Sequence, residues 1–197
     1  MSSTGPYGDP RTAERILQAT WDLIDGSGST PRLVDVADRA GVSRQTVYLH
    51  FGDRAGLLVA LVRYMDQVLG LDEAAEQIRE APTGVEALER MVRALSVFAP
   101  RIYSVAHVLE AAQHQDEAVA AWRDRMRGRQ AMTRVIFQRI ADEGRLAAGW
   151  SVDTAAALSY TLTMPGPWRE LTGELGWSPE MYAENIIKLL RRSLLSN

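Results

Sequence analysis

Apolar residues recur at the spacing of an α-helix along nearly the whole chain, and no segment alternates as a half-buried strand would. Leu57, Leu61 and Met65, for example, fall on one stripe of a predicted helix. A chain of 197 residues, 46% of them hydrophobic, can bury a sizeable core. The sequence therefore predicts an all-α protein.

Side chains that can cap a helix mark several helix starts. In Asp9-Pro10, Thr30-Pro31 and Ser178-Pro179 the capping residue stands directly before a proline, which suits the first helical position. Thr83 and Glu86 have the spacing of a capping box. The predicted helices span about 10–26, 31–40, 44–50, 54–80, 84–99, 101–113, 116–143, 152–164 and 179–195, with Pro100 separating two of them. We expect the apolar segment 165–178 to pack as irregular or short helical structure.

Composition excludes several classes of protein. There is no cysteine, which excludes disulfides, thiolate nucleophiles and cysteine-based zinc sites. Residues 1–5 lack the charged and apolar parts of a signal peptide, and no apolar run is long enough to span a membrane. We therefore expect a cytoplasmic protein without catalytic residues, metal or cofactor.

Two short helices meet around Gly41 in the segment 33–51. Small Ala37 and Ala40 allow the pair to cross closely, and Ser43 can cap the second helix. The apolar stripes are Val36, Ala37 and Ala40 on the first helix, and Val42, Val47 and Phe51 on the second. This arrangement is typical of a helix-turn-helix; a generic helical hairpin would not explain the polar face that is left outward.

That outward face carries side chains suited to DNA. Arg44 can donate two parallel hydrogen bonds to guanine and Gln45 can pair with adenine, each giving roughly 1–3 kcal/mol of discrimination. Other residues suit phosphates, which fix the register without reading the sequence: Ser43, Thr46, Tyr48, His50 and Arg54.

The charge of this region is unusual for a DNA-binding protein. The whole chain has a net charge of −3, and residues 1–55 hold six arginines against seven acids. Nonspecific affinity grows with the number of phosphates neutralised, so few cations predict weak nonspecific binding and reliance on a dimer.

The stretch from Ile16 to Leu58 resembles the N-terminal domain of the tetracycline-repressor (TetR) family of transcription regulators. The resemblance is carried by residues 16–26 (ILQATWDLIDG), 34–43 (VDVADRAGVS) and 46–58 (TVYLHFGDRAGLL). It implies that Arg44 and Gln45 contact bases, while Thr46, Tyr48 and His50 contact the DNA backbone or nearby methyl groups. Arg54 stands where the family usually has lysine, and Arg32 is the candidate to replace a hydroxyl that the family often has before the first helix of the motif.

The same resemblance predicts the organisation of the whole chain. Residues 1–55 would form the helix-turn-helix domain and residues 56–197 a helical domain for ligand binding and dimerisation. The protein would be a homodimeric repressor that a small apolar or aromatic effector releases from a palindromic operator. An architectural or activating DNA-binding protein with a vestigial cavity is the alternative.

Nine residues of the second region are candidates to contact an effector. They are apolar or aromatic apart from one histidine: Met91, Leu95, Phe98, Tyr103, His107, Trp122, Met126, Phe137 and Trp168. The alternative for each of them is ordinary core packing.

The last two helices are candidates for the dimer seam. Residues 155–163 offer a face of small residues, and the apolar residues of the final helix are numerous for a monomer: Ile186, Ile187, Leu189, Leu190, Leu194 and Leu195. The alternative is that both helices pack within their own subunit.

Two further patterns are weaker. His107, Glu110 and His114 share one helical face and include ligand types for zinc or iron, but a closed site would need further ligands, so surface residues or a ligand-binding His107 are the simpler interpretation. Arg123, Arg125, Arg127 and Arg129 alternate and would spread around a helix, which indicates a solvated face.

Overall fold

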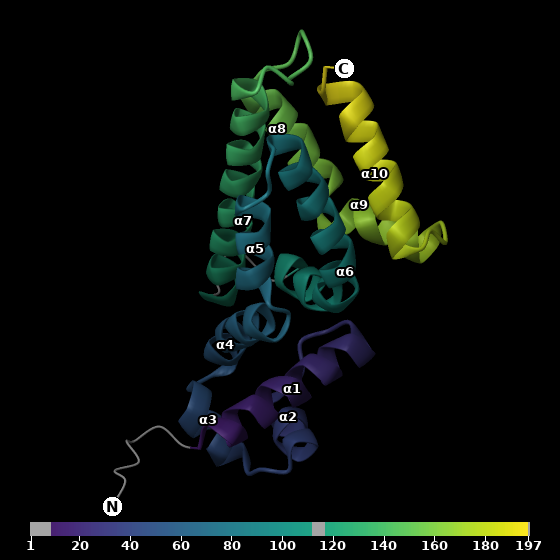
Figure 1. The fold of residues 1–197 in the computed structure, drawn as a ribbon. Coiled ribbons are helices and arrows are strands. Elements are labelled where there is room, and N and C mark those ends of the chain that lie inside the picture. Colours follow the sequence, from purple (N-terminus) through teal and green to yellow (C-terminus); the bar gives the residue numbers. More distant parts are fainter. Residues whose placement is uncertain (1–8, 112–116, 197) are drawn as a thin grey trace, which may run out of the picture. The chain divides into compact units, whose positions relative to one another are not determined.

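The computed structural model describes residues 9–111 and 117–196 of the chain. Its described residues form helices, with no strand beyond an isolated bridge between Leu146 and Leu195. They divide into two compact units: an N-terminal unit of residues up to Leu69 together with Ser104–Arg123, and a C-terminal unit of Gly70–Tyr103 with the residues from Asp124 onward. The all-α prediction is confirmed (Figure 1).

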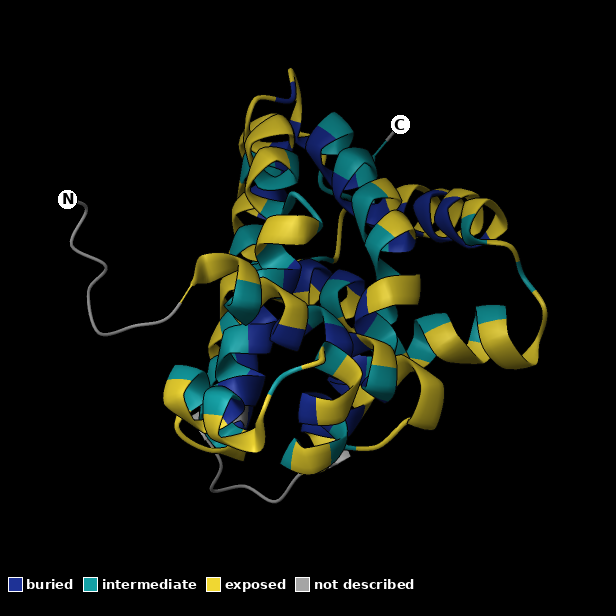
Figure 2. Ribbon diagram, turned by 90° about the horizontal axis from the view of Figure 1, so that it is seen from below, coloured by how far each residue is buried: buried dark blue, intermediate teal, exposed yellow. Residues whose placement is uncertain are grey.

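Four helices make up the beginning of the N-terminal unit: α1 (Pro10–Ser27), α2 (Leu33–Ala40), α3 (Arg44–Phe51) and α4 (Arg54–Val68). Helix α1 packs against α2 and α4, and α3 packs against α2 and α4. The side chains of Trp21, Val36 and Leu61 are almost fully buried among them. In Figure 2 such buried residues lie on the inward faces of the helices, and exposed residues cover the outside.

The remaining elements are α5 (Leu71–Arg79), α6 (Gly84–Ala111), α7 (Glu117–Asp142), α8 (Val152–Leu162), α9 (Pro165–Arg169), the π-helix η1 (Glu170–Glu174) and α10 (Pro179–Leu194). The core of the C-terminal unit includes Leu88, Phe137, Ala155 and Tyr182, which come from four different helices. The segment 165–178 packs against this core through Trp168, as the sequence predicts. No helix of the described part of the chain is both long and apolar enough to cross a bilayer.

Some predicted boundaries are wrong. The helix predicted for 54–80 ends at Val68, because Gly70 adopts the left-handed conformation with φ of 63° and begins a new helix. Pro100 does not end α6. A proline removes one backbone hydrogen bond without ending this helix, which has the buried residues Val92 and Val105 on either side of Pro100.

The predicted caps also differ in outcome. Asp9 and Ser178 cap α1 and α10 as expected, with their side chains accepting hydrogen bonds from the amides of Arg11 and Met181 at 3.1 Å. Thr30 does not cap α2, because that helix begins two residues later with Arg32 at the cap position and no side-chain cap.

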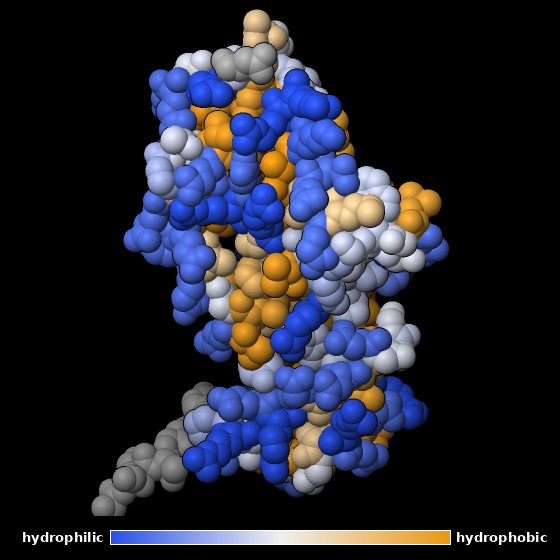
Figure 3. Space-filling view, turned by 45° about the vertical axis from the view of Figure 1, so that its right-hand side comes forward, coloured by the Kyte–Doolittle hydropathy of each residue, from blue (hydrophilic) through white to orange (hydrophobic). Residues whose placement is uncertain are grey.

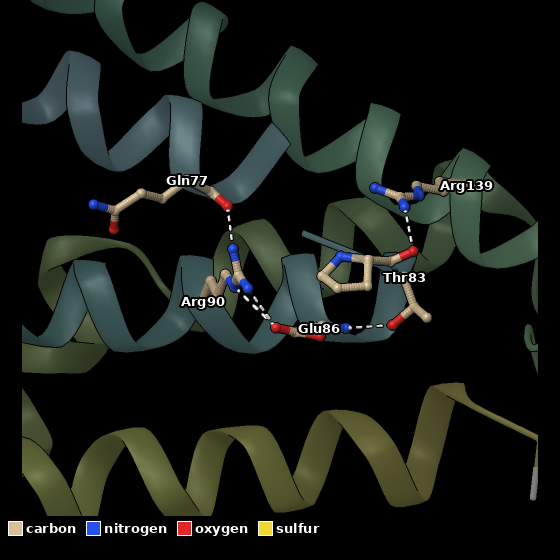
Figure 4. Close-up of polar contacts among 6 residues, drawn as sticks. Gln77, Thr83, Glu86, Arg90 and Arg139 are labelled. Atoms are coloured by element: carbon tan, nitrogen blue, oxygen red, sulfur yellow. Dashed lines mark hydrogen bonds and ion pairs between the residues drawn. The ribbon is translucent and has the colours of Figure 1, made fainter. Parts of the chain in front are cut away.

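The start of α6 is held by side chains from other helices as well as by its cap. Thr83 accepts from the Glu86 amide at 3.1 Å, but the Glu86 carboxylate accepts from Arg90, one turn onward, where a charged donor is available (Figure 4). The Gly84 amide donates to the carboxylate of Glu143 at 2.9 Å. A side chain at Gly84 would collide with Ile140, so this glycine lets α6 start directly against α7.

Candidate functional site

The turn between α2 and α3 depends on Gly41. Its φ of 65° lies in the left-handed region, which an L side chain adopts only with strain. The Val42 amide donates to the carbonyl of Ala37 at 3.0 Å, which closes the turn. Val36 and Val47, exposed by no more than 1%, join the two helices to the core of the unit. The predicted helix-turn-helix is thus present as a fixed pair of helices.

Helix α3 is capped as the sequence predicts. The Thr46 amide donates to Ser43 Oγ at 3.0 Å, and the two hydroxyls lie 2.8 Å apart. With this end fixed, the side chains of Arg44 and Gln45 point to solvent, and neither has a hydrogen-bonding or ion-pair partner among the described residues. Two side chains that could read bases are therefore free to do so.

The next turn of α3 presents a mixed surface. Tyr48 is 62% exposed, whereas His50 is only partly exposed and its ring centroid lies 5.8 Å from that of Phe51. Leu49 is 70% exposed, a residue that the sequence analysis did not single out. Beside Tyr48 it can make the apolar contact that a thymine methyl group accepts.

The start of α4 lies close to the end of α3. Asp53 caps α4 by accepting from the Gly56 amide at 2.8 Å, and Arg54 follows as an exposed residue. A Cβ at Gly56 would lie 2.2 Å from the carbonyl oxygen of Phe51. Gly56 therefore permits the close contact that sets the recognition helix against α4, a role that the sequence motif did not indicate.

Arg32 is less available than its exposure indicates. Its Nε and Nη2 atoms each donate to the Asp35 carboxylate at 2.8 Å, one turn along α2. The hydrogen bonds from Arg32 hold the pKa of Asp35 below its usual value, and the same contact raises the pKa of Arg32. The charge that was expected to bind a phosphate is already paired within the chain.

The nine predicted effector residues are divided between the two units. Met91 and Phe137 are buried in the core of the C-terminal unit, with Leu95 and Trp168 packed against it. The ring of Tyr103 lies 6.2 Å from that of Trp168. Phe98 and Met126 are partly exposed residues of the same unit, whereas the exposed His107 and the buried Trp122 belong to the N-terminal unit.

The alternating arginines do not all lie on a solvated face. Arg127 is exposed and pairs with Asp124 on its own helix. Arg129 is partly buried: its Nη2 donates to the Tyr160 carbonyl at 3.0 Å and to Thr163 Oγ1 at 2.9 Å. The solvated-face interpretation is therefore wrong for Arg129, because α8 packs over that part of α7 and no local pattern in α7 encodes the contact.

The faces predicted for a dimer seam are largely buried within the chain. Ala155, Ser159, Ile186 and Leu190 are buried in this way, so packing within one subunit accounts for the many apolar residues of α10. Of the predicted seam residues, Leu158 on α8 and Leu189 on α10 stay exposed, and Met181 on α10 is exposed as well. Apolar side chains also reach the surface between polar ones in Figure 3.

Two other candidate sites have little support. A groove of about 480 Å³ in the C-terminal unit is lined by Thr83, Val85, Glu86, Glu89, Arg90, Arg93 and Arg191. Four of its charged groups are paired with one another, Arg90 with Glu86 and Arg191 with Glu89, and none of the predicted effector residues lines it. His114 lies outside the described residues, which contain no cluster of three side chains able to hold a metal ion.

A capped recognition helix with free polar side chains, fixed on a helical bundle, defines a helix-turn-helix DNA-binding protein. Residues 16–61 match the family described as "Bacterial regulatory proteins, tetR family". This segment of the chain is therefore similar to the DNA-binding domain of the TetR regulators.

Solved structures share the fold over nearly the full chain. A transcriptional regulator from Saccharomonospora viridis, solved with choline, is 18% identical with a TM-score of 0.79, covering 96% of this chain and 100% of that one. FadR from Bacillus subtilis, solved with stearoyl-CoA, is 20% identical with a TM-score of 0.73, covering 89% and 96%. NalD from Pseudomonas aeruginosa, a secondary repressor of a multidrug efflux pump, is 19% identical with a TM-score of 0.71, covering 95% and 97%. No curated protein matches the sequence.

Proposed function

We propose that this protein is a homodimeric repressor that binds a palindromic operator and leaves it when a small molecule binds the C-terminal unit. The observation that carries the proposal is the outer face of α3, where Arg44 and Gln45 are exposed and have no partner among the described residues. A regulator of chromosomal genes acts in the cytoplasm, which is where we place it.

Dimerisation is supported by the exposed face of α8 and α10. These two helices contact each other, and their outward residues include Leu158, Met181 and Leu189, which are 36%, 47% and 47% exposed. Two such faces together would make a four-helix seam with twofold symmetry. A dimer also supplies two recognition helices, which a unit with few cations needs for tight binding.

Effector binding is supported by the similar structures, two of which were solved with a small molecule bound. Met91, Leu95, Phe137 and Trp168 lie in or against one apolar core and are the residues we propose to contact the effector, with Tyr103 beside Trp168. The effector must bind the DNA-free conformation more tightly than the DNA-bound one, since a ligand with equal affinity for both shifts nothing.

The experiment that tests the proposal is selection of bound sequences from a pool of random DNA duplexes. We expect an inverted repeat whose half-sites are one helical turn apart or a multiple of it. Selection of no sequence, or of a site without symmetry, would contradict the proposal.

Sedimentation of the purified protein tests the dimer separately. We expect twice the chain mass of 21.8 kDa at micromolar concentration. Leu158→Glu with Leu189→Glu should give monomers, whereas Val135→Glu, which places a negative charge on a more exposed position of α7, should not. A monomeric wild type would refute the dimer while leaving DNA binding open to its own test.

A further inference from the structure

The C-terminal unit contains buried hydrogen-bond donors that lack acceptors. Arg129 Nε, Ser159 Oγ and Trp168 Nε1 are buried and have no partner in the described part of the chain. Guanidinium and indole N–H groups can only donate, and a hydroxyl can donate. This unit therefore lacks hydrogen-bond acceptors for these donors. Buried polar groups without a partner are rare in native proteins, so their presence here calls for an explanation.

Arg129 is the charged member of this group. Its Nη2 hydrogen bonds go to a carbonyl and a hydroxyl, and its guanidinium carbon lies 4.8 Å from the centroid of the Tyr160 ring. All of these partners are neutral, so they leave the positive charge uncompensated.

The other groups that act on Arg129 also leave its positive charge uncompensated. Burial lowers the pKa of Arg129 to about 10, and the other groups acting on it are Tyr160, Tyr182 and Arg125. No carboxylate of the described residues forms an ion pair with it, whereas nearby Arg127 and Arg134 are paired with Asp124 and Asp153. The region is electropositive.

The other two donors lie in the same unit. Thr163, which accepts from Arg129, donates to the carbonyl of Ser159 at 2.9 Å, so Ser159 lies one helical turn before the residue that binds the arginine. Trp168 follows on α9 and packs, with Leu95, against the core that contains Met91 and Phe137. Donors and apolar side chains are thus combined in one region.

We propose that the effector of this protein is a monocarboxylate with an apolar or aromatic tail, and that Arg129 binds its carboxylate. The inference rests on the proposed effector response and names the chemical class of the ligand. One negative charge balances the buried guanidinium of Arg129, and two carboxylate oxygens can accept from Arg129 and from a second donor of this unit such as Ser159. A quaternary ammonium such as choline would meet a like charge at this position.

The test compares carboxylates with neutral molecules of the same shape. Hexanoate, benzoate and 3-phenylpropanoate are each measured beside the corresponding primary amide, with choline chloride as the cation, by thermal unfolding and by quenching of tryptophan fluorescence at up to about 10 mM ligand. We expect at least one acid to bind the wild type about tenfold or more tightly than its amide, since charged hydrogen bonds are the stronger ones.

Variants assign the preference to Arg129. Arg129→Gln should remove the difference between acid and amide, and Arg129→Lys should restore part of it because the charge returns. Arg127→Gln, on the same helix but exposed and paired with Asp124, should bind as the wild type does. The proposal is overturned if no acid is preferred over its amide, or if Arg129→Gln keeps the preference.

A measurement of operator binding distinguishes failure of this inference from failure of the proposed function. In the absence of ligand, Arg129→Gln should bind the selected operator as tightly as the wild type, because Arg129 lies far along the chain from α3 and in the other unit. Release of the wild type by choline or an amide but by no acid would preserve the effector response and refute the carboxylate.

Discussion

The two units of this protein differ in where their notable polar side chains lie, exposed in one and buried in the other. In the N-terminal unit Arg44, Gln45 and Tyr48 lie outside a tightly fixed pair of helices, where a partner can reach them. In the C-terminal unit the notable polar groups, Arg129 and Ser159, lie inside, among apolar helices. The first unit leaves polar groups accessible to a partner outside it, whereas the second keeps unpaired polar groups in its interior.

The largest predicted effect, on both stability and operator binding, is expected for a substitution at Gly56 in the N-terminal unit. In Gly56→Ala the new methyl group would lie 2.2 Å from the Phe51 carbonyl oxygen, so α3 and α4 must separate. We expect the free energy of unfolding of the N-terminal unit to fall by roughly 3 kcal/mol, with operator binding lost. Urea denaturation and a mobility-shift titration measure the two effects.

Gly128→Ala is the matched control for that substitution. Gly128 lies inside α7, is exposed, and has no atom within 4 Å of an added Cβ. Alanine there should stabilise the protein by about 0.5–1 kcal/mol through helix propensity. Wild-type stability for Gly56→Ala would mean that the close contact between α3 and α4 is not required.

The second prediction concerns the exposed residues of α3. Arg44→Ala and Gln45→Ala should each reduce discrimination at a different base pair of the half-site by roughly 1–3 kcal/mol, whereas Tyr48→Ala should weaken binding to all sequences alike. Because all three side chains are exposed, stability should change by no more than about 0.5 kcal/mol. Selection from random duplexes with each variant measures the specificity, and an unchanged preference in the double variant Arg44→Ala, Gln45→Ala would contradict the assignment.

The sequence predicts the N-terminal unit well because its information is local. The turn glycine, the cap Ser43 and the apolar stripe through Val47 all fall within twenty residues, and each has a direct physical role there. The pairing of Arg32 with Asp35 is also local but was not predicted, and the exposure of Leu49, to which the sequence analysis gave no role, depends on how α3 is rotated against its neighbours.

The C-terminal unit is less predictable because its important contacts join distant segments. Nothing in residues 123–129 distinguishes Arg129 from the solvated Arg127, since the difference comes from Tyr160 and Thr163 on another helix. Ile186, Ile187, Leu190 and Leu194 of α10 are buried within the chain whereas Leu189 is exposed, and the sequence does not say whether a second copy or the same chain covers such residues.

The third prediction tests whether Arg129 is retained for stability or for binding. Its folded-state pKa of about 10 is below the unfolded value, so the protonated form is disfavoured by folding. That penalty is present in full below about pH 10 and shrinks as the pH rises above it. Arg129→Met should therefore raise the stability of the ligand-free protein near neutral pH by about 1 kcal/mol, and the gain should diminish above pH 10.

Thermal unfolding at pH 8 and at pH 10.5 measures this difference, with Arg127→Gln as an exposed control that should change little. The carbonyl of Tyr160 and the hydroxyl of Thr163 keep other hydrogen bonds, so the methionine variant strands neither. A clear loss of stability in Arg129→Met would show that the arginine stabilises the fold.

The smallest predicted effect is on the salt dependence of DNA binding, and it concerns Arg32 and Arg54 on the surface of the N-terminal unit. Arg32 is bound by Asp35, whereas Arg54 has no partner among the described residues, so of these two arginines it is Arg54 that is free to release counterions from DNA. Arg54→Ala should reduce the slope of log affinity against log salt by about 0.9 per subunit, and Arg32→Ala should leave it nearly unchanged. Asp35→Ala should free Arg32 and make the slope steeper. Equal losses of slope for Arg32→Ala and Arg54→Ala would mean that Arg32 exchanges Asp35 for a phosphate on binding, and the number of cations facing DNA would then exceed what the free protein presents.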